Sequence, residues 1–227
     1  LFLNVLFIAA TTITSVAIAI MLAEISNKWV KKITQSIVIL PHFMSWTIVS
    51  MLSVAILSAN GVVNQLITMV GGKTIEFYNT PSVWPVILVI LKVWQGAGFG
   101  SIVYLATITG IDASIYEAAA VDGASKTQCI FKVTLPMLKN TIIMLTIMSV
   151  GKIFNGDFGM IYAMVGSNSI LYPTTDVIDT YLFRQLLENP SMGQTAAVGL
   201  IQSILGFGFV VLCNKVANKW SPESALF

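Results

Sequence analysis

Four polar side chains lie in two pairs within long apolar stretches of the sequence. Lys92 and Gln95 form one pair, and Lys152 and Asn155 form the other. Residues three apart share one face of a helix, and polar groups at membrane depth normally face a water-filled or protein-lined interior. Each pair could therefore bind a polar solute through hydrogen bonds. The alternative is that both lysines lie near the outer membrane boundary or pair with acids such as Asp157.

The sequence offers no residue set for covalent catalysis or metal binding. His42 is the single histidine, and neither a cysteine nor a carboxylate cluster accompanies it at a metal-binding spacing. The Gly71–Thr74 segment (Gly-Gly-Lys-Thr) resembles the end of a phosphate-binding loop, but Ile67 stands where the earlier glycine is required. We therefore expect no catalytic residue, no metal site and no cofactor bound by this chain. This pattern argues against a membrane-embedded hydrolase.

The composition is typical of a membrane protein. Of the 227 residues, 56% are hydrophobic and only 10% are charged, whereas a soluble domain has about a quarter charged residues. The net charge of +2 is too small to indicate nucleic-acid binding. Because backbone polar groups must be paired internally in lipid, we expect an all-α polytopic membrane protein.

Five stretches are long and apolar enough to cross a hydrocarbon core of about 30 Å as helices. The second of them is interrupted by Pro41-His42. A further segment, 174–189, is predicted to be an amphipathic helix on the outer face. No composition shift marks a boundary, so residues 1–227 are expected to form a single domain. The five expected spans are 1–23, 33–58, 83–108, 137–154 and 196–213.

Basic residues are distributed unevenly between the two sets of loops that alternate along these spans. One set, together with the flanking Lys139, holds eight lysines, and the other holds only Lys73 and Arg184. The positive-inside rule places the lysine-rich set in the cytoplasm. The lysine-rich set is 24–32, 109–136 and the C-terminal tail, and the other set is 59–82 and 155–195.

The polar segment 112–136 is predicted to form two short helices that meet at a bend. Asp112 is a favourable N-cap for the first helix, and Gly123 suits the left-handed position that ends it. Ser125 begins a Ser-x-x-Gln capping box for the second helix. Pro136 is expected to limit that helix and to open the next span.

Several residues of this segment stand at a characteristic spacing: Glu117-Ala118-Ala119, Gly123, Val133 and Leu135-Pro136. The pattern resembles the cytoplasmic coupling loop of permease subunits of binding-protein-dependent ABC importers, with valine where isoleucine is usual. The resemblance implies that the loop docks into a cleft of a nucleotide-binding ATPase subunit. The residues expected to form it are Glu117, Ala118, Ala119, Asp122, Gly123, Val133, Leu135 and Pro136.

The resemblance extends over nearly the whole chain. Segments 40–46, 94–110 and 175–181 are similar to the carbohydrate branch of these permeases, particularly to oligosaccharide and polysaccharide permeases akin to the membrane subunits of the maltose importer. This implies the type I ABC importer permease fold. Such permeases usually carry another helix before the first one seen here, so the chain is expected to lack its first helix.

The resemblance also gives the polar residues expected roles. Amides would bind sugar hydroxyls and aromatic rings would stack on sugar faces along a translocation pathway formed by Trp46, Trp94, Gln95, Lys152 and Asn155. On the outer segment, the apolar side chains would pack over the spans. Its polar residues Asp176, Asp179 and Arg184 would contact an extracellular or periplasmic solute-binding protein.

The expected function is import of a sugar or oligosaccharide by alternating access. The expected partners are cytoplasmic ATPase subunits that bind ATP and Mg²⁺, a second and different permease subunit, and the binding protein. The expected location is the bacterial inner (cytoplasmic) membrane, with the coupling loop and the C-terminus in the cytoplasm. An amino-acid or peptide ABC importer is the main alternative. An ion-coupled secondary transporter fits less well, because the acids lie mostly in loops or at span edges.

Overall fold

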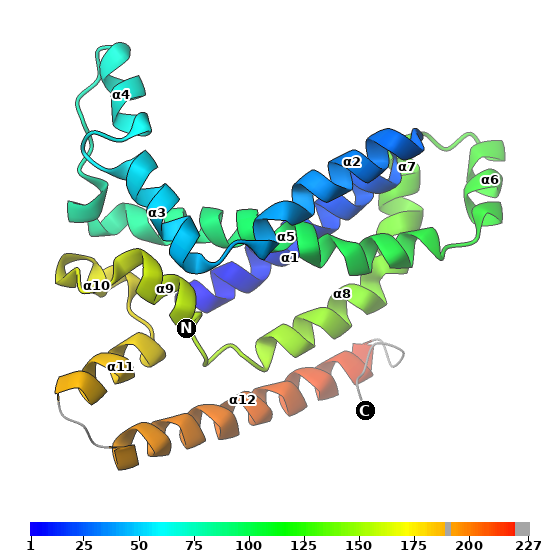
Figure 1. Ribbon diagram of the computed structural model, residues 1–227. Coiled ribbons are helices and arrows are strands. Elements are labelled where there is room, and N and C mark those ends of the chain that lie inside the picture. The colour runs from blue at the N-terminus through cyan, green and yellow to red at the C-terminus, as the bar shows by residue number, and fades with distance from the viewer. Residues whose placement is uncertain (189–191, 221–227) are drawn as a thin grey trace. The chain divides into compact units, whose positions relative to one another are not determined.

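Residues 1–188 and 192–220 are described by the computed structural model, and their regular structure is helical throughout (Figure 1). The prediction of an all-α protein is confirmed. The α-helices are α1 (Phe2–Ala23), α2 (Lys28–Ile39), α3 (Trp46–Leu57), α4 (Val62–Met69), α5 (Trp84–Thr109), α6 (Ala113–Val121), α7 (Lys126–Cys129), α8 (Leu135–Val150), α9 (Phe158–Val165), α10 (Tyr172–Thr175), α11 (Ile178–Glu188) and α12 (Met192–Trp220).

Five helical stretches in the described part of the chain are long and apolar enough to cross a membrane. This agrees with the number of spans expected from the sequence. Because only helices satisfy all backbone hydrogen bonds within one segment, each can lie in hydrocarbon without a partner strand. The stretches are Phe2–Ala23, Trp46–Met69, Pro81–Thr109, Lys126–Val150 and Gly193–Lys219.

The region of the second expected span, 33–58, is not one continuous helix. The helix breaks at the 3₁₀ turn Leu40–Phe43, which contains the interrupting Pro41, and Ser45 then caps α3. Proline has no backbone N–H and disfavours the α conformation of the residue before it, which explains the break. By length and hydropathy, the candidate span in this region is Trp46–Met69 rather than 33–58.

The start of the fourth span also differs from the expectation. Pro136 does not end the preceding helix, because α7 continues into α8 through the π-helical turn Ile130–Thr134. Pro136 has no N–H to donate to the carbonyl of Lys132, four residues earlier. In the π turn, the N–H of Leu135 reaches the carbonyl of Ile130 instead, which widens the helix around the proline.

The helix predicted in segment 174–189 begins later than expected. Thr174 and Thr175 belong to the end of α10, and α11 starts at Ile178. Their hydroxyls do not cap α11, because Thr174 donates to Pro81 and Thr175 donates to Leu171. Asn189, the last residue of the predicted 174–189 segment, lies outside the described residues. The C-terminal helix α12 is longer than the expected 196–213 at both ends.

The chain forms two compact units, each with its own apolar core. Unit 1 comprises residues 1–7, 43–92 and 152–205, and unit 2 comprises 8–42, 93–151 and the segment from Gly206 onward. The core of unit 1 includes Trp84, Leu88, Met160, Ile161 and Leu171. The core of unit 2 includes Val16, Ala19, Leu22, Tyr104, Leu105, Ile108 and Leu138.

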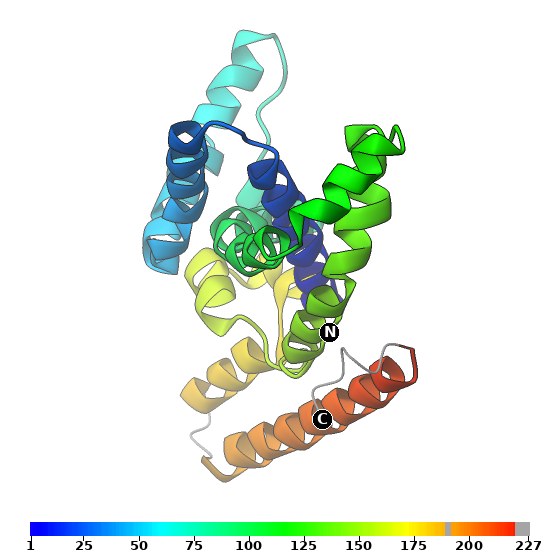
Figure 2. The same cartoon turned by 90° about the vertical axis from the view of Figure 1, so that its right-hand side faces the viewer.

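Glycines allow close helix packing in unit 2, where α1 and α2 lie beside α5 (Figure 2). A Cβ atom on Gly98 would lie 2.6 Å from the carbonyl carbon of Val38, and one on Gly100 would lie 2.7 Å from Oγ of Ser15. Ser15 is buried and donates to the carbonyl of Ala97 at 3.0 Å. Small residues at helix crossings are typical of membrane bundles, where van der Waals packing and interhelical hydrogen bonds drive association.

Gly98→Ala is expected to destabilise the protein by about 1–3 kcal/mol, because its methyl group would collide with the backbone of Val38. Gly96→Ala is the matched control on the same helix, since its nearest neighbour, Thr11, lies at an ordinary contact distance of 3.8 Å. The measurement is thermal unfolding of the purified protein in detergent. An equal loss of stability in both variants would contradict the proposed close packing.

Candidate functional site

The predicted bend between two short helices is present in unit 2 (Figure 1). Asp112 caps α6 by accepting from the N–H of Ser114 at 2.9 Å, and this hydrogen bond holds the pKa of the Asp112 carboxyl below its usual value. Ser125 and Gln128 form the predicted capping box at the start of α7. Both cap predictions are therefore confirmed.

The bend itself is a Schellman motif. Gly123 has a φ of +77°, and its N–H donates to the carbonyl of Ala120 at 3.0 Å. The N–H of Ala124 donates to the carbonyl of Ala119 at 2.9 Å. These two bonds satisfy the last carbonyls of α6, and the positive φ makes glycine the favoured residue at this position.

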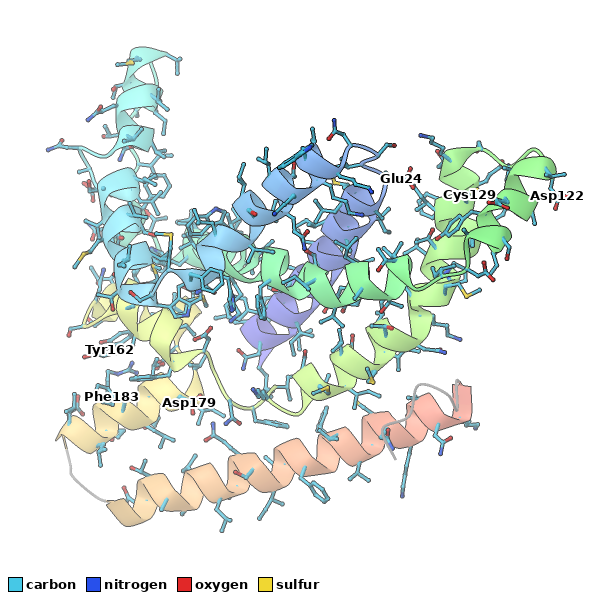
Figure 3. The ribbon with its side chains drawn as sticks, turned by 45° about the vertical axis from the view of Figure 1, so that its right-hand side comes forward. Glu24, Asp122, Cys129, Tyr162, Asp179 and Phe183 are labelled. Carbon is cyan, nitrogen blue, oxygen red and sulfur yellow. The ribbon has the colours of Figure 1, made fainter. Side chains whose placement is uncertain are left out.

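The predicted coupling residues divide into an exposed set and a packed set. Glu117, Ala118, Asp122, Gly123 and Pro136 are exposed, whereas Ala119, Val133 and Leu135 are half-buried. Figure 3 places Asp122 at the bend between α6 and α7. Val121 beside it is 88% exposed. The end of α6 therefore presents an apolar surface with acidic neighbours.

A hydrogen bond that the sequence did not indicate joins this helix pair to the span that follows. The hydroxyls of Tyr116 on α6 and Thr134 in the π turn lie 3.0 Å apart, and Thr134 is buried. Both residues line a cavity of about 230 Å³ with Glu24, near the end of α1. The orientation of α6 is thus tied to the irregular turn that Pro136 requires.

Lys92, the first member of the first polar pair, forms an ion pair within unit 1. Nζ of Lys92 lies 2.5 Å from Oδ2 of Asp157 and 5.8 Å from the centroid of the Trp46 ring. The other carboxylate oxygen of Asp157 accepts from the N–H of Met160 and caps α9. The alternative in which a lysine pairs with Asp157 is therefore the observed one for Lys92. Trp46 packs beside this pair.

Of the remaining pathway candidates, Trp94 and Gln95 lie on the part of α5 that belongs to unit 2. Trp94 is 44% exposed, and Gln95 is half-buried. One turn further on, Phe99 is stacked on His42, with ring centroids 4.1 Å apart and planes inclined by 6°. The lone histidine is thus part of an aromatic contact in unit 2.

The second polar pair does not lie on a helix face as predicted. α8 ends at Val150, so Lys152 and Asn155 lie in a turn that precedes α9. The N–H of Asn155 donates to the carbonyl of Lys152 at 3.0 Å, and both side chains are exposed. Within the described residues, the Lys152 side chain has no ion pair or hydrogen bond. The turn therefore presents a free ammonium group and an amide.

An open groove of about 480 Å³ lies next to this turn in unit 1. Asn155, Asp179 and Gln202 supply polar groups to its lining, and Phe158 and Phe183 supply aromatic rings. Phe183 is in edge contact with both Phe158 and Tyr162, with centroids 5.1 and 5.0 Å apart, and this contact packs α11 against α9 (Figure 3).

The acidic and basic residues predicted to contact a binding protein are all used within the chain. Arg184 donates to both carboxylate oxygens of Asp176 and lies 3.8 Å above the Tyr172 ring, and the hydrogen bond to Asp176 raises the pKa of the guanidinium. Asp179 accepts from the N–H of Gly156. The contact of Asp176, Asp179 and Arg184 with another protein stays a prediction. The side chains that α11 exposes include Tyr181 and Leu187.

Residues 15–220 match the family described as "binding-protein-dependent transport system inner membrane component". Two similar proteins come from Bacillus subtilis (strain 168). The polygalacturonan/rhamnogalacturonan transport system permease protein YteP is 32% identical over 92% of this chain and 64% of its own length. Protein LplB is 31% identical over 91% of this chain and 64% of its own length. The chain thus spans less than two thirds of these relatives.

The fold is also similar to a solved structure described as a bacterial alginate ABC transporter in complex with an alginate pentasaccharide-bound periplasmic protein. The TM-score is 0.91 at 33% sequence identity, and the match covers 97% of this chain and 76% of the other. A match of this size over nearly all residues shows that the two chains share one fold.

Asp157→Asn is expected to destabilise the protein by about 1–3 kcal/mol, because it leaves Lys92 without its charged partner. Adding Lys92→Met should recover part of this loss, since no unpaired charge then remains. Lys73→Met removes an exposed lysine and should change stability by less than about 0.5 kcal/mol. Thermal unfolding in detergent compares the wild type with Asp157→Asn, Lys92→Met, the double variant and Lys73→Met. Strictly additive effects of the two single changes at 92 and 157 would contradict an energetic interaction between Lys92 and Asp157.

Proposed function

Because this chain belongs to the family of binding-protein-dependent transport system inner membrane components, we propose that it is the permease subunit of an ATP-driven importer. In this proposal it passes a sugar or oligosaccharide from an extracellular or periplasmic binding protein into the cytoplasm by alternating access. The subunit does not hydrolyse ATP. ATP and Mg²⁺ bind in separate nucleotide-binding subunits, and a second permease chain supplies the other half of the pathway.

The observation that carries this proposal is the helix pair α6–α7 with its glycine bend. Both helices are capped by side chains of the same segment, which satisfy backbone N–H groups at their starts without a partner protein. Its tip exposes Glu117, Val121 and Asp122, which suits insertion into a groove of a partner protein. The hydrogen bond between Tyr116 and Thr134 gives a physical route from a docked α6 to the base of α8.

In this mechanism, the free energy for transport comes from ATP binding and hydrolysis in the ATPase subunits. ATP binding must stabilise one conformation of the ATPase subunits more than the other, and the docked helix pair shares that preference with the spans. Closure of the ATPase dimer would favour the outward-open spans, and hydrolysis would reset them. Only differences in binding free energy between the two states move the equilibrium, so tight docking that is equal in both states would transport nothing.

The distribution of lysines supports an orientation with α6 and α7 on the cytoplasmic side of a bacterial cell membrane. The lysine-rich loops include the start of α2, with Lys28, Lys31 and Lys32, and the end of α12, with Lys215 and Lys219. The C-terminus is then cytoplasmic as well. In this orientation the helix pair is on the side where ATP is available.

A saccharide is the substrate class that the relatives support best. YteP is named for polygalacturonan and rhamnogalacturonan transport, and the alginate transporter was solved with a pentasaccharide-bound partner. In this chain, the exposed amide of Asn155 can bind hydroxyl groups. The exposed ammonium of Lys152 can in addition bind a carboxylate. These groups suit an acidic oligosaccharide, and the names of the relatives favour a saccharide over the amino acids or peptides of the alternative importers.

Gly123→Ala and Glu117→Ala are each expected to lower solute uptake several-fold to about tenfold, the effect of losing one central interface contact. The first forces a side chain into the left-handed region, and the second removes an exposed acid from the docking surface. The assay is uptake by the assembled transporter in membrane vesicles, with the amount of bound ATPase subunit measured in parallel.

The matched control for the bend is Gly110→Ala, because Gly110 lies just before the same loop and has room for a methyl group at ordinary contact distances. This variant should transport normally. Membrane insertion should be normal in all three variants. Unchanged uptake and ATPase binding in Gly123→Ala and Glu117→Ala would refute the docking role.

Lys152→Gln is expected to raise the KM for a carboxylated trisaccharide such as trigalacturonate about tenfold, because a charge-assisted hydrogen bond is lost. A neutral trisaccharide such as maltotriose is the matched control probe, and its KM should not change. Uptake of both radiolabelled sugars by the assembled transporter is the measurement. Equal changes for the two probes would remove Lys152 from carboxylate recognition.

A further inference from the structure

The turn between α8 and α9 leaves several backbone groups without helical hydrogen-bond partners. Helix α8 ends at Val150 and α9 begins at Phe158, so the intervening residues cannot form a continuous helix ladder. Backbone polar groups that are shielded from water need protein or ordered-water partners. The hydrogen-bond partners of these backbone groups therefore show how the turn is held in place.

The side chain of Asn4 on α1 satisfies two carbonyls of the turn. Its Nδ2 donates to the carbonyl of Ile153 at 2.7 Å and to that of Asn155 at 3.3 Å. Asn4 is only 7% exposed, so this amide is directed into the protein and is not available to a solute. Its role is to hold the backbone.

Gln202 on α12 satisfies the carbonyl between those two. Its Nε2 donates to Phe154 at 2.9 Å and to Oδ1 of Asp179 at 3.1 Å. The other carboxylate oxygen of Asp179 accepts from the N–H of Gly156. Gln202 is 5% exposed. Four consecutive residues, 153 to 156, thus have a backbone group bonded to a side chain from α1, α11 or α12.

Packing adds a steric constraint at the end of the turn. A Cβ atom on Gly156 would lie 2.9 Å from Cβ of Val177 and 3.2 Å from a carboxylate oxygen of Asp179. Only glycine allows the backbone to approach the start of α11 so closely. The turn is therefore fixed by hydrogen bonds at three carbonyls and by direct contact at its last residue.

We propose that Asn4, Asp179 and Gln202 are positioning residues that hold the 152–156 turn in the geometry in which Lys152 and Asn155 bind the transported solute. They act through the turn and do not contact the solute. This inference rests on the proposed function. The sequence indicated no role for the buried amides of Asn4 and Gln202. By holding the turn, they would control the affinity of the permease for its substrate.

The test uses isosteric substitutions that remove the donor and keep the shape. Gln202→Glu and Asn4→Asp each replace an amide that donates two hydrogen bonds by a carboxyl group, which donates none when ionised and at most one when protonated. Both should raise the KM for trigalacturonate about five- to tenfold in the assembled transporter. Basal ATPase activity and the amount of transporter in the membrane should stay at wild-type values.

A second change should reverse the effect in part. In Gln202→Glu combined with Asp179→Asn, the new amide at 179 can donate to the new carboxylate at 202 and still accept from Gly156. The KM of this double variant should therefore lie below that of Gln202→Glu alone. Ser203→Ala is the matched control on α12, because its exposed hydroxyl bonds only within its own helix, to Gly199. It should leave the KM unchanged.

Three outcomes would overturn the inference. An unchanged KM with a maximal rate that falls in proportion to the amount of inserted protein would show that the amides only stabilise the fold. If the isosteric variants do not insert, maleimide labelling of Asn155→Cys is measured with Gln202 intact and in a background of Gln202→Asn. Equal labelling rates in the two backgrounds would show that Gln202 does not hold the 152–156 turn. Absence of saccharide uptake by the wild-type transporter would overturn the proposed function, and this inference with it.

Discussion

The need to pair every backbone N–H and C=O group away from water governs this protein. It accounts for the helical spans, and it also accounts for the places where the helices are irregular. At Pro136 the missing N–H is accommodated by a π-helical turn in which Leu135 bonds to Ile130. After Val150 the ladder stops altogether, and the carbonyls of the following turn are satisfied by the buried amides of Asn4 and Gln202.

A related constraint applies to charged side chains, because burying a charge without a partner costs free energy. Lys92 is paired with Asp157, which also caps α9, so one carboxylate neutralises a lysine and satisfies a helix end. Arg184 is held by Asp176 and by the face of Tyr172. Lys152 differs from both, since its side chain has no such partner in the described residues. An exposed ammonium group without a carboxylate partner in the described residues is suited to bind a ligand.

The helix pair α6–α7 shows which features can be predicted from residues close together in the sequence. Asp112, Gly123 and Ser125 act within five residues of their own positions, so their roles could be predicted from the sequence and are confirmed. The contact between Tyr116 and Thr134 could not, because it joins residues 18 positions apart through a π turn that no pattern indicated. The family membership and the shared fold agree with the resemblance found in the sequence.

The sequence by itself determined the class of the protein, the number of spans and the bend of the exposed helix pair. These follow from hydropathy and from hydrogen bonds between near neighbours, which do not depend on how distant segments pack. Only the tertiary structure decided the partner of Lys92, the inward direction of Asp179 and the end of α8 before Lys152. Those features depend on which distant groups packing brings within about 3 Å, and residues such as Lys92 and Asp157 are 65 positions apart.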